Sequence, residues 1–210
     1  MSIEEPSRRN VALLGPSLNG KYSLMSQLKI QGVVGPSKRK IVGNQHEHRG
    51  HLQKCLHLDF FPKGLQGQEV RLRTFSGAVF HRAEAVEELL RDCDEVWFVA
   101  LETGYTYTVR ETTLIEEGQA DCLAYLEEIT LQARELGKTP QDVPWLLILN
   151  QVIGVSAGSG IHLREHSWFQ AGSVPTIEIN ALDDIQSLLE FFRSDEYGGG
   201  ITAAIEGGVS

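Results

Sequence analysis

The sequence is poor in the features that mark secreted, membrane-spanning and nucleic-acid-binding proteins. It has only 3 cysteines and no C-x-x-C pair, which argues against a disulfide framework or a thiolate zinc site. No stretch approaches the roughly 18 consecutive apolar residues of a membrane span, and the start, MSIEEP, lacks the basic and apolar parts of a signal peptide. With 19 Lys and Arg against 28 Asp and Glu, the formal net charge of -9 repels phosphate backbones and anionic lipid. We therefore expect a cytoplasmic protein that binds no nucleic acid and does not insert stably into a membrane.

What the chain does contain suits one globular domain. Its 210 residues are 41% hydrophobic and include 8 Phe, 5 Tyr and 3 Trp, which is enough for a sizeable core. We expect an N-terminal extension at residues 1–9, a single domain at residues 10–194 and a glycine-rich flexible tail at residues 195–210.

Apolar periodicity predicts that strands and helices alternate along the chain. Short apolar or alternating runs predict strands at residues 11–14, 56–61, 70–75, 95–101, 144–150 and 174–179. Apolar residues at helical spacing predict helices at about residues 21–29, 83–92, 113–136 and 185–192. Residues 32–54 and 151–172 show no period and are expected to be irregular, the first of them forming the longest loop. This order favours a three-layer α/β fold with a mostly parallel sheet and one antiparallel edge strand, supplied by a hairpin at residues 56–75.

The turn after the first expected strand carries a motif typical of phosphate binding. Residues 15–23 read GPSLNGKYS, which fits G-x-x-x-x-G-K and places Lys21 at the head of the first expected helix. In such a loop the backbone N–H groups and the helix N-terminus surround a phosphate while the lysine ammonium contacts its oxygens. The alternative interpretation is a glycine turn followed by a surface lysine.

The residue after the lysine does not suit magnesium binding in the usual geometry. That position normally holds Ser or Thr, whose short hydroxyl ligates the magnesium that bridges the outer phosphates. Here it is Tyr22, whose phenol is too bulky to replace that hydroxyl. Ser23 lies one residue further and is rotated by about 100° around the helix.

Five segments, in order, resemble the MglA family of bacterial Ras-like small GTPases, which set cell polarity in gliding motility. They are residues 15–21 (GPSLNGK), 58–62 (LDFFP), 74–80 (TFSGAVF), 96–100 (VWFVA) and 147–150 (LILN). The family writes them as GPGxxGKT, FDFLP, TVPGQVF, VFVAD and a strand ending in NKxD, and the resemblance covers roughly residues 10–193. Thr74 reproduces a family trait, a threonine where most small GTPases have an aspartate.

The resemblance implies a P-loop G-domain-like fold and a nucleotide site. The residues that would bind nucleotide or phosphate, if binding is retained, are Gly15, Asn19, Gly20, Lys21, Tyr22, Ser23, Gly77 and Asn150. It also implies a partner of the roadblock (MglB-like) class that docks across the switch regions, here residues 33–62 and 75–92. The residues expected on that surface are Lys54, Asp59, Phe60, Phe61, Thr74 and Phe80.

The departures from the family pattern gather where nucleotide chemistry would occur. The family's switch threonine falls near Cys55 or Leu56, and its catalytic arginine falls near Lys54, which cannot span phosphate oxygens as a guanidinium does. The glutamine that orients the attacking water is replaced by Ala78, and NKxD reads NQVI at residues 150–153. Loss of the arginine alone costs roughly 10³ to 10⁵ in rate for this reaction class, so we expect no catalytic residues and negligible hydrolysis.

These observations favour an MglA-like pseudo-GTPase that acts as a protein-interaction scaffold or adaptor, with weak or absent GTP binding and no cofactor. The alternative is a divergent active small GTPase that binds GTP or GDP with Mg²⁺ and is completed by a partner protein. A P-loop kinase has less support, because no arginine-rich lid segment follows the core.

Three further groups of residues admit more than one interpretation. His46, Glu47, His48 and His51 could bind a transition metal if the segment folds around the ion, but the spacing matches no specific site. We expect a solvated loop there, serving as a partner surface or a pH-sensitive segment, and we assign no metal site. Cys55, Cys93 and Cys122 are expected to act as small apolar core residues. Residues 168–169 (Trp-Phe), in a glycine-bearing loop, are either core or an exposed adhesive pair.

Overall fold

The computed structural model describes residues 7–16, 19–30, 41–48, 51–60, 68–75, 82–101, 111–151, 163–171 and 173–192. Seven strands form one sheet in the order β2-β3-β4-β1-β5-β6-β7. The strands are β1 (Ser7–Leu14), β2 (Ile41–His48), β3 (His51–Phe60), β4 (Gln68–Phe75), β5 (Glu95–Leu101), β6 (Trp145–Asn150) and β7 (Thr176–Ile179). The helices are α1 (Lys21–Ile30), α2 (Arg82–Arg91), α3 (Glu111–Glu135), α4 (Ser167–Ala171) and α5 (Gln186–Phe191), with a short 3₁₀ helix, η1 (Leu163–Glu165).

The sheet is mostly parallel, and the expected α/β class is confirmed. Strand β1 is parallel to β4 and β5, and the run continues in parallel through β6 and β7. Strand β3 is antiparallel to both of its neighbours, β4 and β2. Among the described strands β3 is therefore the one that runs against the rest, but it is not the edge strand that the sequence predicted, because β2 lies outside it.

The prediction of a single long loop at residues 32–54 is wrong. Residues 41–48 form β2, and β3 begins at residue 51 rather than at residue 56. The sequence of β2 reads IVGNQHEH, which has no alternation of apolar and polar residues. An edge strand is stabilised by backbone hydrogen bonds to one neighbour and needs no buried face, so the pattern that identifies other strands is missing here.

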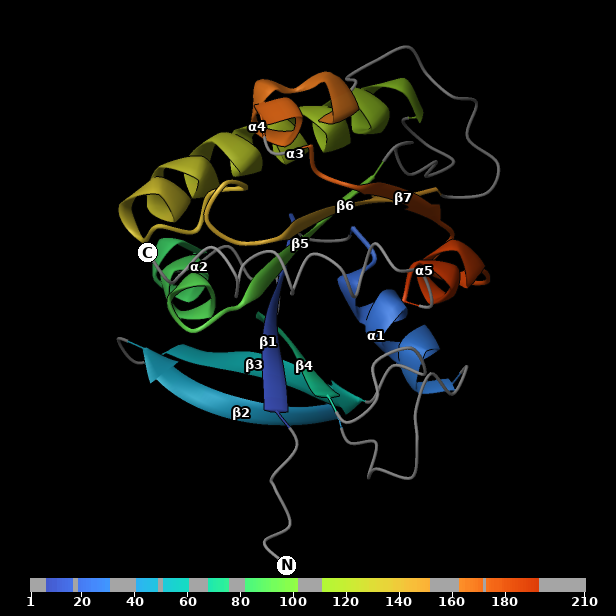
Figure 1. Ribbon diagram of the computed structural model, residues 1–210. Coiled ribbons are helices and arrows are strands. Elements are labelled where there is room, and N and C mark those ends of the chain that lie inside the picture. The colour runs from blue at the N-terminus through green and yellow to red at the C-terminus, as the bar shows by residue number, and fades with distance from the viewer. Residues whose placement is uncertain are drawn as a thin grey trace, which may run out of the picture.

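Helices cover both faces of the sheet and make three layers (Figure 1). Helices α2, α3 and α4 pack on one face, where they meet Leu14, Phe98 and Leu147. Helices α1 and α5 pack on the other face, where they meet Leu13 and Val99. Neighbouring residues of a strand point to opposite faces, so a central strand covered on both sides must be apolar throughout. Every residue of β5 is buried, as its unbroken apolar sequence predicted.

The predicted helices are confirmed, with one addition. The α3 helix ends just before Gly137, whose φ of 61° lies in the left-handed region that favours glycine as a helix stop. The α4 helix falls within residues 151–172, where we expected irregular structure; a helix of 5 residues is too short to show a helical period.

Packing of α4 decides the open question at Trp168 and Phe169. Both side chains are buried, Trp168 edge-on against Trp145 with ring centroids 5.4 Å apart and Phe169 against Phe98 at 5.8 Å. They belong to the core and do not form an exposed adhesive pair.

The first strand begins earlier than the expected start of the domain. Strand β1 begins at Ser7, inside the segment expected as an extension, and residues 195–210 lie outside the described part of the chain. Within the described residues, the helices are each too short or too polar to cross a bilayer.

Candidate functional site

The loop between β1 and α1 lies at the position where an open parallel sheet forms its ligand crevice. After β1 the chain builds β2, β3 and β4 on one side, and then crosses through α2 to β5 on the other side of β1. The strand order therefore reverses at β1. Ligands of such folds bind beyond the carboxyl ends of the strands at this switch point, and the β1–α1 loop begins there with Gly15.

Two glycines of this loop are required by its geometry. Gly15 has a φ of 139°, and a Cβ there would lie 2.2 Å from the carbonyl oxygen of Val99 on β5. Gly20 has a φ of 88°, and a Cβ there would lie 2.3 Å from Nδ2 of Asn150 at the end of β6. Both positions combine left-handed backbone with close approach of another segment, which only glycine tolerates. The geometry of the loop thus explains why the sequence has glycine at both positions.

Lys21 is held inside the loop. Helix α1 begins at Lys21, and its first turn is closed by the N–H of Leu24 donating to the carbonyl of Gly20 at 2.8 Å. The Lys21 side chain is 6% exposed, and its Nζ donates to the carbonyl oxygens of Gly15 at 2.6 Å and Pro16 at 2.5 Å. The alternative interpretation, a glycine turn with a surface lysine, is therefore wrong.

Asn19 fixes the loop to the sheet and to α3. The side chain is 2% exposed, and its Nδ2 donates to the carbonyl oxygen of Val99 at 3.1 Å and to Sγ of Cys122 on α3 at 3.3 Å. A buried amide needs such partners because an unsatisfied donor costs about 1–3 kcal/mol.

Asn150 connects the same loop to the far side of the site. Its Nδ2 donates to the carbonyl oxygen of Asn19 at 3.1 Å, and its Oδ1 accepts from the backbone N–H of Ala181 at 2.8 Å. Ala181 belongs to the turn between β7 and α5, which is closed by backbone hydrogen bonds between Asn180 and Asp184. One side chain therefore joins three segments that are far apart in the sequence.

Tyr22 and Ser23 follow Lys21 on α1 and differ from it in burial. The Tyr22 side chain is 41% exposed, and Ser23 is half-buried. The described part of the expected nucleotide site thus consists of a buried group (Asn19, Lys21, Asn150), its two glycines, and these two hydroxyl-bearing residues at its outer side. Gly77, Ala78 and residues 152–153 lie outside the described residues.

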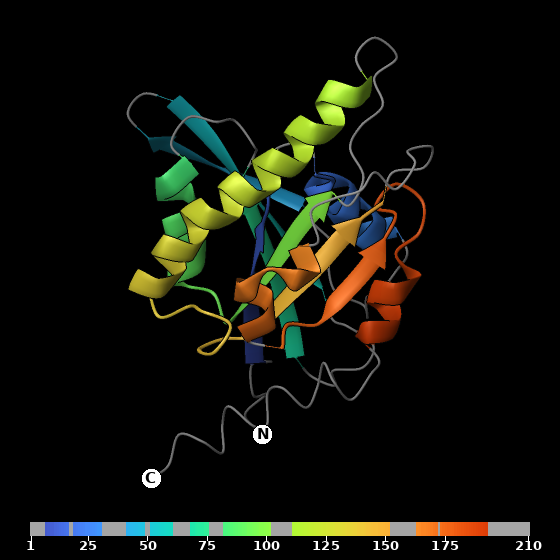
Figure 2. The same ribbon diagram turned by 90° about the horizontal axis from the view of Figure 1, so that it is seen from above.

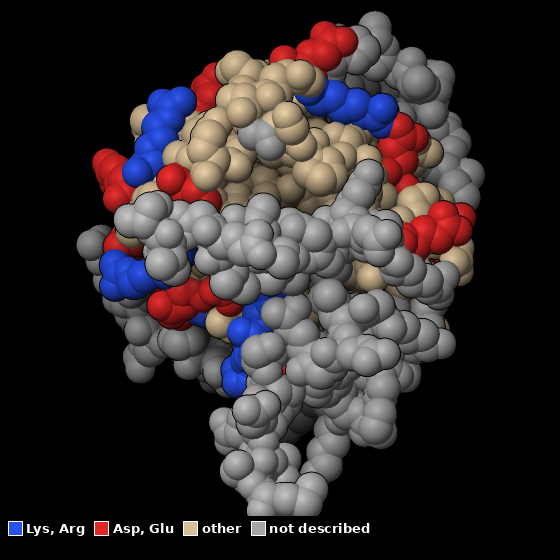
Figure 3. All heavy atoms as spheres, in the orientation of Figure 1, with Lys and Arg blue, Asp and Glu red and all other residues tan. Residues whose placement is uncertain are grey.

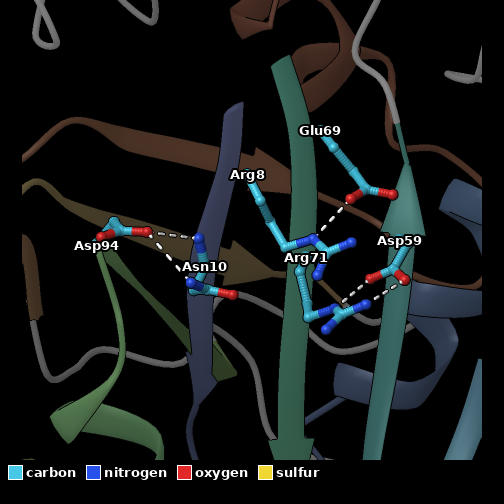
Figure 4. Close-up of polar contacts among 6 residues, drawn as sticks. All are labelled: Arg8, Asn10, Asp59, Glu69, Arg71 and Asp94. Carbon is cyan, nitrogen blue, oxygen red and sulfur yellow. Dashed lines mark hydrogen bonds and ion pairs between the residues drawn. The ribbon is translucent and has the colours of Figure 1, made fainter. Parts of the chain in front are cut away.

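Asp59, one of the expected switch-surface residues, forms a bidentate ion pair with Arg71. It lies opposite Arg71 in the β3–β4 pairing, and the guanidinium donates Nε to Oδ1 at 2.6 Å and an NH2 group to Oδ2 at 2.7 Å (Figure 4). Partial burial, the largest single effect, raises the pKa of the Asp59 carboxyl. The hydrogen bonds and charge of Arg71, with smaller contributions from His57 and Arg8, together lower it by more, so the net pKa lies below its ordinary value. The same pairing holds the pKa of Arg71 above its ordinary value.

Two other expected surface residues lie in the core. Phe60 is fully buried and packs edge-on against Phe192 of the α5 segment, with ring centroids 5.8 Å apart. Thr74 is 1% exposed and its hydroxyl donates to the carbonyl oxygen of Leu13 at 2.8 Å. In this structure both side chains stabilise the sheet and contribute no surface. Lys54 lies on β3 opposite Gln45 in the register, whereas Phe61 and Phe80 lie outside the described residues.

The polar contacts around Asp59 extend across the sheet toward β5. Arg8 of β1 pairs with Glu69 of β4 at 2.6 Å, and Asp94, just before β5, accepts from the backbone N–H of Asn10 at 2.7 Å (Figure 4). Acidic and basic side chains are interspersed over the described part of the face shown in Figure 3. Exposed ion pairs of this kind contribute only about 0–1 kcal/mol each to stability.

Two cysteines occupy the core as predicted. Cys93 and Cys122 are buried and free, and burial raises the pKa of the Cys93 thiol to about 11. In addition to packing in the core, the Cys122 Sγ accepts a hydrogen bond from the Asn19 side chain of the β1–α1 loop. Cys55 lies on β3 opposite Asn44 in the register.

Sequence reasoning missed Ala181, Cys122 and Val99 as neighbours of the loop. Ala181 and Val99 contact the site through backbone groups, and backbone contacts cannot be predicted from the type of residue. The one available signal was the NALDD run at residues 180–184, whose Asn and Asp residues are typical of a turn.

The described residues of the site do not indicate another class of ligand, and comparison with known proteins does not indicate one either. Among the side chains that the structure describes, no group of His, Cys, Asp and Glu is arranged to hold a metal ion. No protein-family model matches the chain, and no curated protein sequence matches it significantly. The resemblance to the MglA family therefore depends on the sequence motifs alone.

Proposed function

We propose that this chain is a cytoplasmic, MglA-like pseudo-GTPase: a G-domain-like scaffold or adaptor that binds other proteins, binds GTP weakly or not at all, and does not hydrolyse it. The observation that carries the proposal is the contrast between two adjacent residues of α1. Lys21 is buried and held by the loop, whereas Tyr22 stands at the magnesium-ligand position with its side chain 41% exposed.

The β1–α1 loop supports this proposal because its described polar side chains form hydrogen bonds with the protein itself. The Lys21 ammonium donates to two loop carbonyls, and Asn19 and Asn150 use their amides to bind backbone and sulfur atoms. A nucleotide phosphate would have to draw Nζ away from Gly15 and Pro16, and charge-assisted hydrogen bonds of this kind are among the stronger ones in proteins. These contacts favour a structural role for the loop, which a scaffold can use without nucleotide.

Chemistry at the outer phosphates has little support from the residues present. A P-loop GTPase needs a short hydroxyl on magnesium, a group that orients water and a cation for the developing charge. The corresponding residues are Tyr22, Ala78 and Lys54. The base-reading motif is reduced to Asn150, which is engaged with Asn19 and Ala181.

The expected partner is a roadblock (MglB-like) protein that docks across residues 33–62 and 75–92. Support comes from the position of β2 at the edge of the sheet and of Asp59, which is half-buried on the adjacent strand. Edge strands present unpaired backbone groups to other chains.

The alternative, a divergent GTPase that a partner completes, is favoured by one observation. Gly15 and Gly20 keep the left-handed conformations and the tight packing that a phosphate-binding backbone needs. In that case Lys21 would contact the β- and γ-phosphates, and the partner would have to supply the missing cation and the group that orients water.

A hydrolysis assay with a matched inactive variant separates the two. Lys21→Ala removes the group that the GTPase alternative places at the phosphates, and Lys29→Ala, in the last turn of the same helix, is the control. We expect GTP turnover by the wild type to equal that of both variants, since any residual rate then comes from contaminating enzymes. Turnover that is lost in Lys21→Ala and kept in Lys29→Ala would establish the GTPase alternative. Unfolding curves show whether each variant is folded.

The partner is tested independently of the nucleotide. Co-elution of the purified chain with a roadblock-class protein on a sizing column, without added nucleotide, is the expected result. Complex formation that requires GTP and is abolished by GDP would contradict the pseudo-GTPase proposal.

A further inference from the structure

Helix α3 makes polar contacts with both the β1–α1 loop and α2. In the first contact, Sγ of Cys122, which is 1% exposed, accepts from Nδ2 of Asn19 at 3.3 Å. In the second, Nε2 of Gln132 donates to the carbonyl oxygen of Ala83, in the first turn of α2, at 3.1 Å. Figure 2 shows α3 lying across the sheet with α2 beside it. One helix therefore contacts both the candidate site and the expected partner surface at residues 75–92.

The part of α3 between these two contacts is packed tightly on the sheet. Leu126 and Ile129, which lie between them, are fully buried in the core. Cys122 and Gln132 are ten residues apart on the helix, which is about 15 Å along its axis. A helix packed in this way moves as one body, so a displacement at one contact also reaches the other.

Each of the two contacts is weak at one of its atoms. A thiol sulfur is a weak hydrogen-bond acceptor, so the bond from Asn19 to Cys122 is weaker than the bond from Asn19 to the carbonyl of Val99. The Oε1 atom of Gln132 is buried and has no hydrogen-bond partner among the described residues. A buried acceptor without a partner favours a rearrangement that supplies one. Both contacts can therefore be lost at a small cost in free energy.

We propose that α3 couples α2 to the β1–α1 loop, with Gln132 and Cys122 as the positioning residues at its two contacts. Asn19 directly precedes Gly20 and Lys21, and its side chain holds the loop in the form in which the lysine ammonium donates to the loop carbonyls. Loss of the Cys122 contact loosens that form. A protein that docks on α2 would act on the loop by this route. That last step rests on the function proposed above, whereas the coupling itself does not.

The experiment is hydrogen exchange, read by mass spectrometry, on the full-length chain without nucleotide or partner. The reporter is a peptide covering residues 15–24, in which the N–H of Leu24 donates to the carbonyl of Gly20 at 2.8 Å. Cys122→Ala should speed its exchange about two- to tenfold, the range for the net loss of one hydrogen bond. Gln132→Ala should also speed it, although the substitution lies at the α2 contact. The double variant should exchange no faster than Cys122→Ala alone, because Gln132 acts through Cys122.

Matched variants separate coupling from a general loss of packing. Cys122→Ser keeps an acceptor and should restore most of the wild-type exchange rate. Cys93→Ala removes a buried thiol that contacts the carbonyl of Leu90, and Arg134→Ala removes an exposed side chain of α3 that lies over the Trp168 ring. Both should leave exchange in the loop unchanged. A peptide covering β6 should exchange at the wild-type rate in every variant, since local opening does not require global unfolding.

The outcomes decide the proposal without reference to nucleotide binding. Unchanged loop exchange in Gln132→Ala, additive effects in the double variant, no rescue by Cys122→Ser, or equal acceleration in the loop and in β6 would each overturn it. If Cys122→Ala fails to fold, as judged by circular dichroism, Cys122→Val replaces it. Tight binding of nucleotide would contradict the function proposed above and leave the coupling intact, so the two failures are distinguishable.

Discussion

The side-chain amide of Asn150 donates to the carbonyl oxygen of Asn19 at 3.1 Å and so joins the end of β6 to the β1–α1 loop. Its Oδ1 accepts from the backbone N–H of Ala181, and Gly20 leaves no space for a Cβ beside the same amide. The family resemblance assigned Asn150 to nucleotide recognition. In the structure it connects three segments of the protein.

Replacement of Asn150 should therefore destabilise the chain. Asn150→Ala leaves the N–H of Ala181 and the carbonyl of Asn19 without this partner in a buried site. We expect a loss of about 2–3 kcal/mol in the free energy of unfolding, measured by urea titration. Gln151→Ala, the next residue and exposed, is the control and should change stability by less than about 0.5 kcal/mol. Equal stability of the two variants would show that the Asn150 contacts do not form.

The close approach of Gly15 to β5 gives a second prediction. A Cβ at Gly15 would lie 2.2 Å from the carbonyl of Val99, which forces the backbone apart. Gly15→Ala should cost about 3 kcal/mol or more. Gly137→Ala is the matched control, because Gly137 also has positive φ but a Cβ there would meet nothing within 4 Å. That control should cost about 1–2 kcal/mol for the left-handed conformation alone. Similar melting temperatures for the two variants would contradict the packing of the loop.

The Asp59–Arg71 pair predicts a specific pH dependence. The pKa of Asp59 is lower in the folded protein than in the unfolded chain, so its ionised form favours folding. Its contribution is present above the unfolded pKa of about 3.9 and is lost as the pH falls through the folded value. The pair is partly exposed, so we expect Asp59→Asn to cost about 1 kcal/mol or less at pH 7.

The measurement for this pair is urea unfolding of wild type and Asp59→Asn between about pH 3 and pH 7. The difference between them should shrink as the pH falls below about 4. Asp183→Asn, at an exposed position, serves as the control. A difference for Asp59→Asn that stays constant over the whole range would mean that the ionised carboxyl is not what stabilises the β3–β4 pairing.

The buried thiol of Cys93 predicts slow chemical modification. Burial raises its pKa to about 11, and its Sγ contacts the carbonyl of Leu90 at 3.3 Å. At pH 8 about a thousandth of this thiol is thiolate, the form that reacts. Alkylation followed by peptide mass spectrometry should leave Cys93 unmodified in the native protein and modify it fully in urea. Rapid native labelling at Cys93 would place it outside the core.

The sequence was informative wherever burial imposes a pattern. The unbroken apolar run of β5 and the helical period of α3 predicted their elements, and the glycine and lysine spacing located the β1–α1 loop. Each of these features can be recognised in the sequence, because a buried strand, a helix face and a left-handed turn each accept only certain types of residue.

The sequence was uninformative where the structure uses backbone groups or an edge. The sequence of strand β2 does not alternate between apolar and polar residues, and α4 is shorter than two helical turns. Ala181 enters the site through its N–H, which every residue type except proline carries. The burial of Trp168 depends on Trp145, which no local pattern connects to it.

The central proposal is that the β1–α1 loop has a structural role in this protein and no longer serves as a nucleotide-binding site. The most direct test is a calorimetric titration of the purified chain with GDP, a nonhydrolysable GTP analogue and ATP, each with and without magnesium. We predict no binding, or binding no tighter than about 1 mM that does not depend on magnesium or distinguish guanine from adenine. Tight, magnesium-dependent binding of guanine nucleotide would contradict the account, because it would show that Tyr22 is compensated and that Lys21 releases the loop carbonyls to bind phosphate.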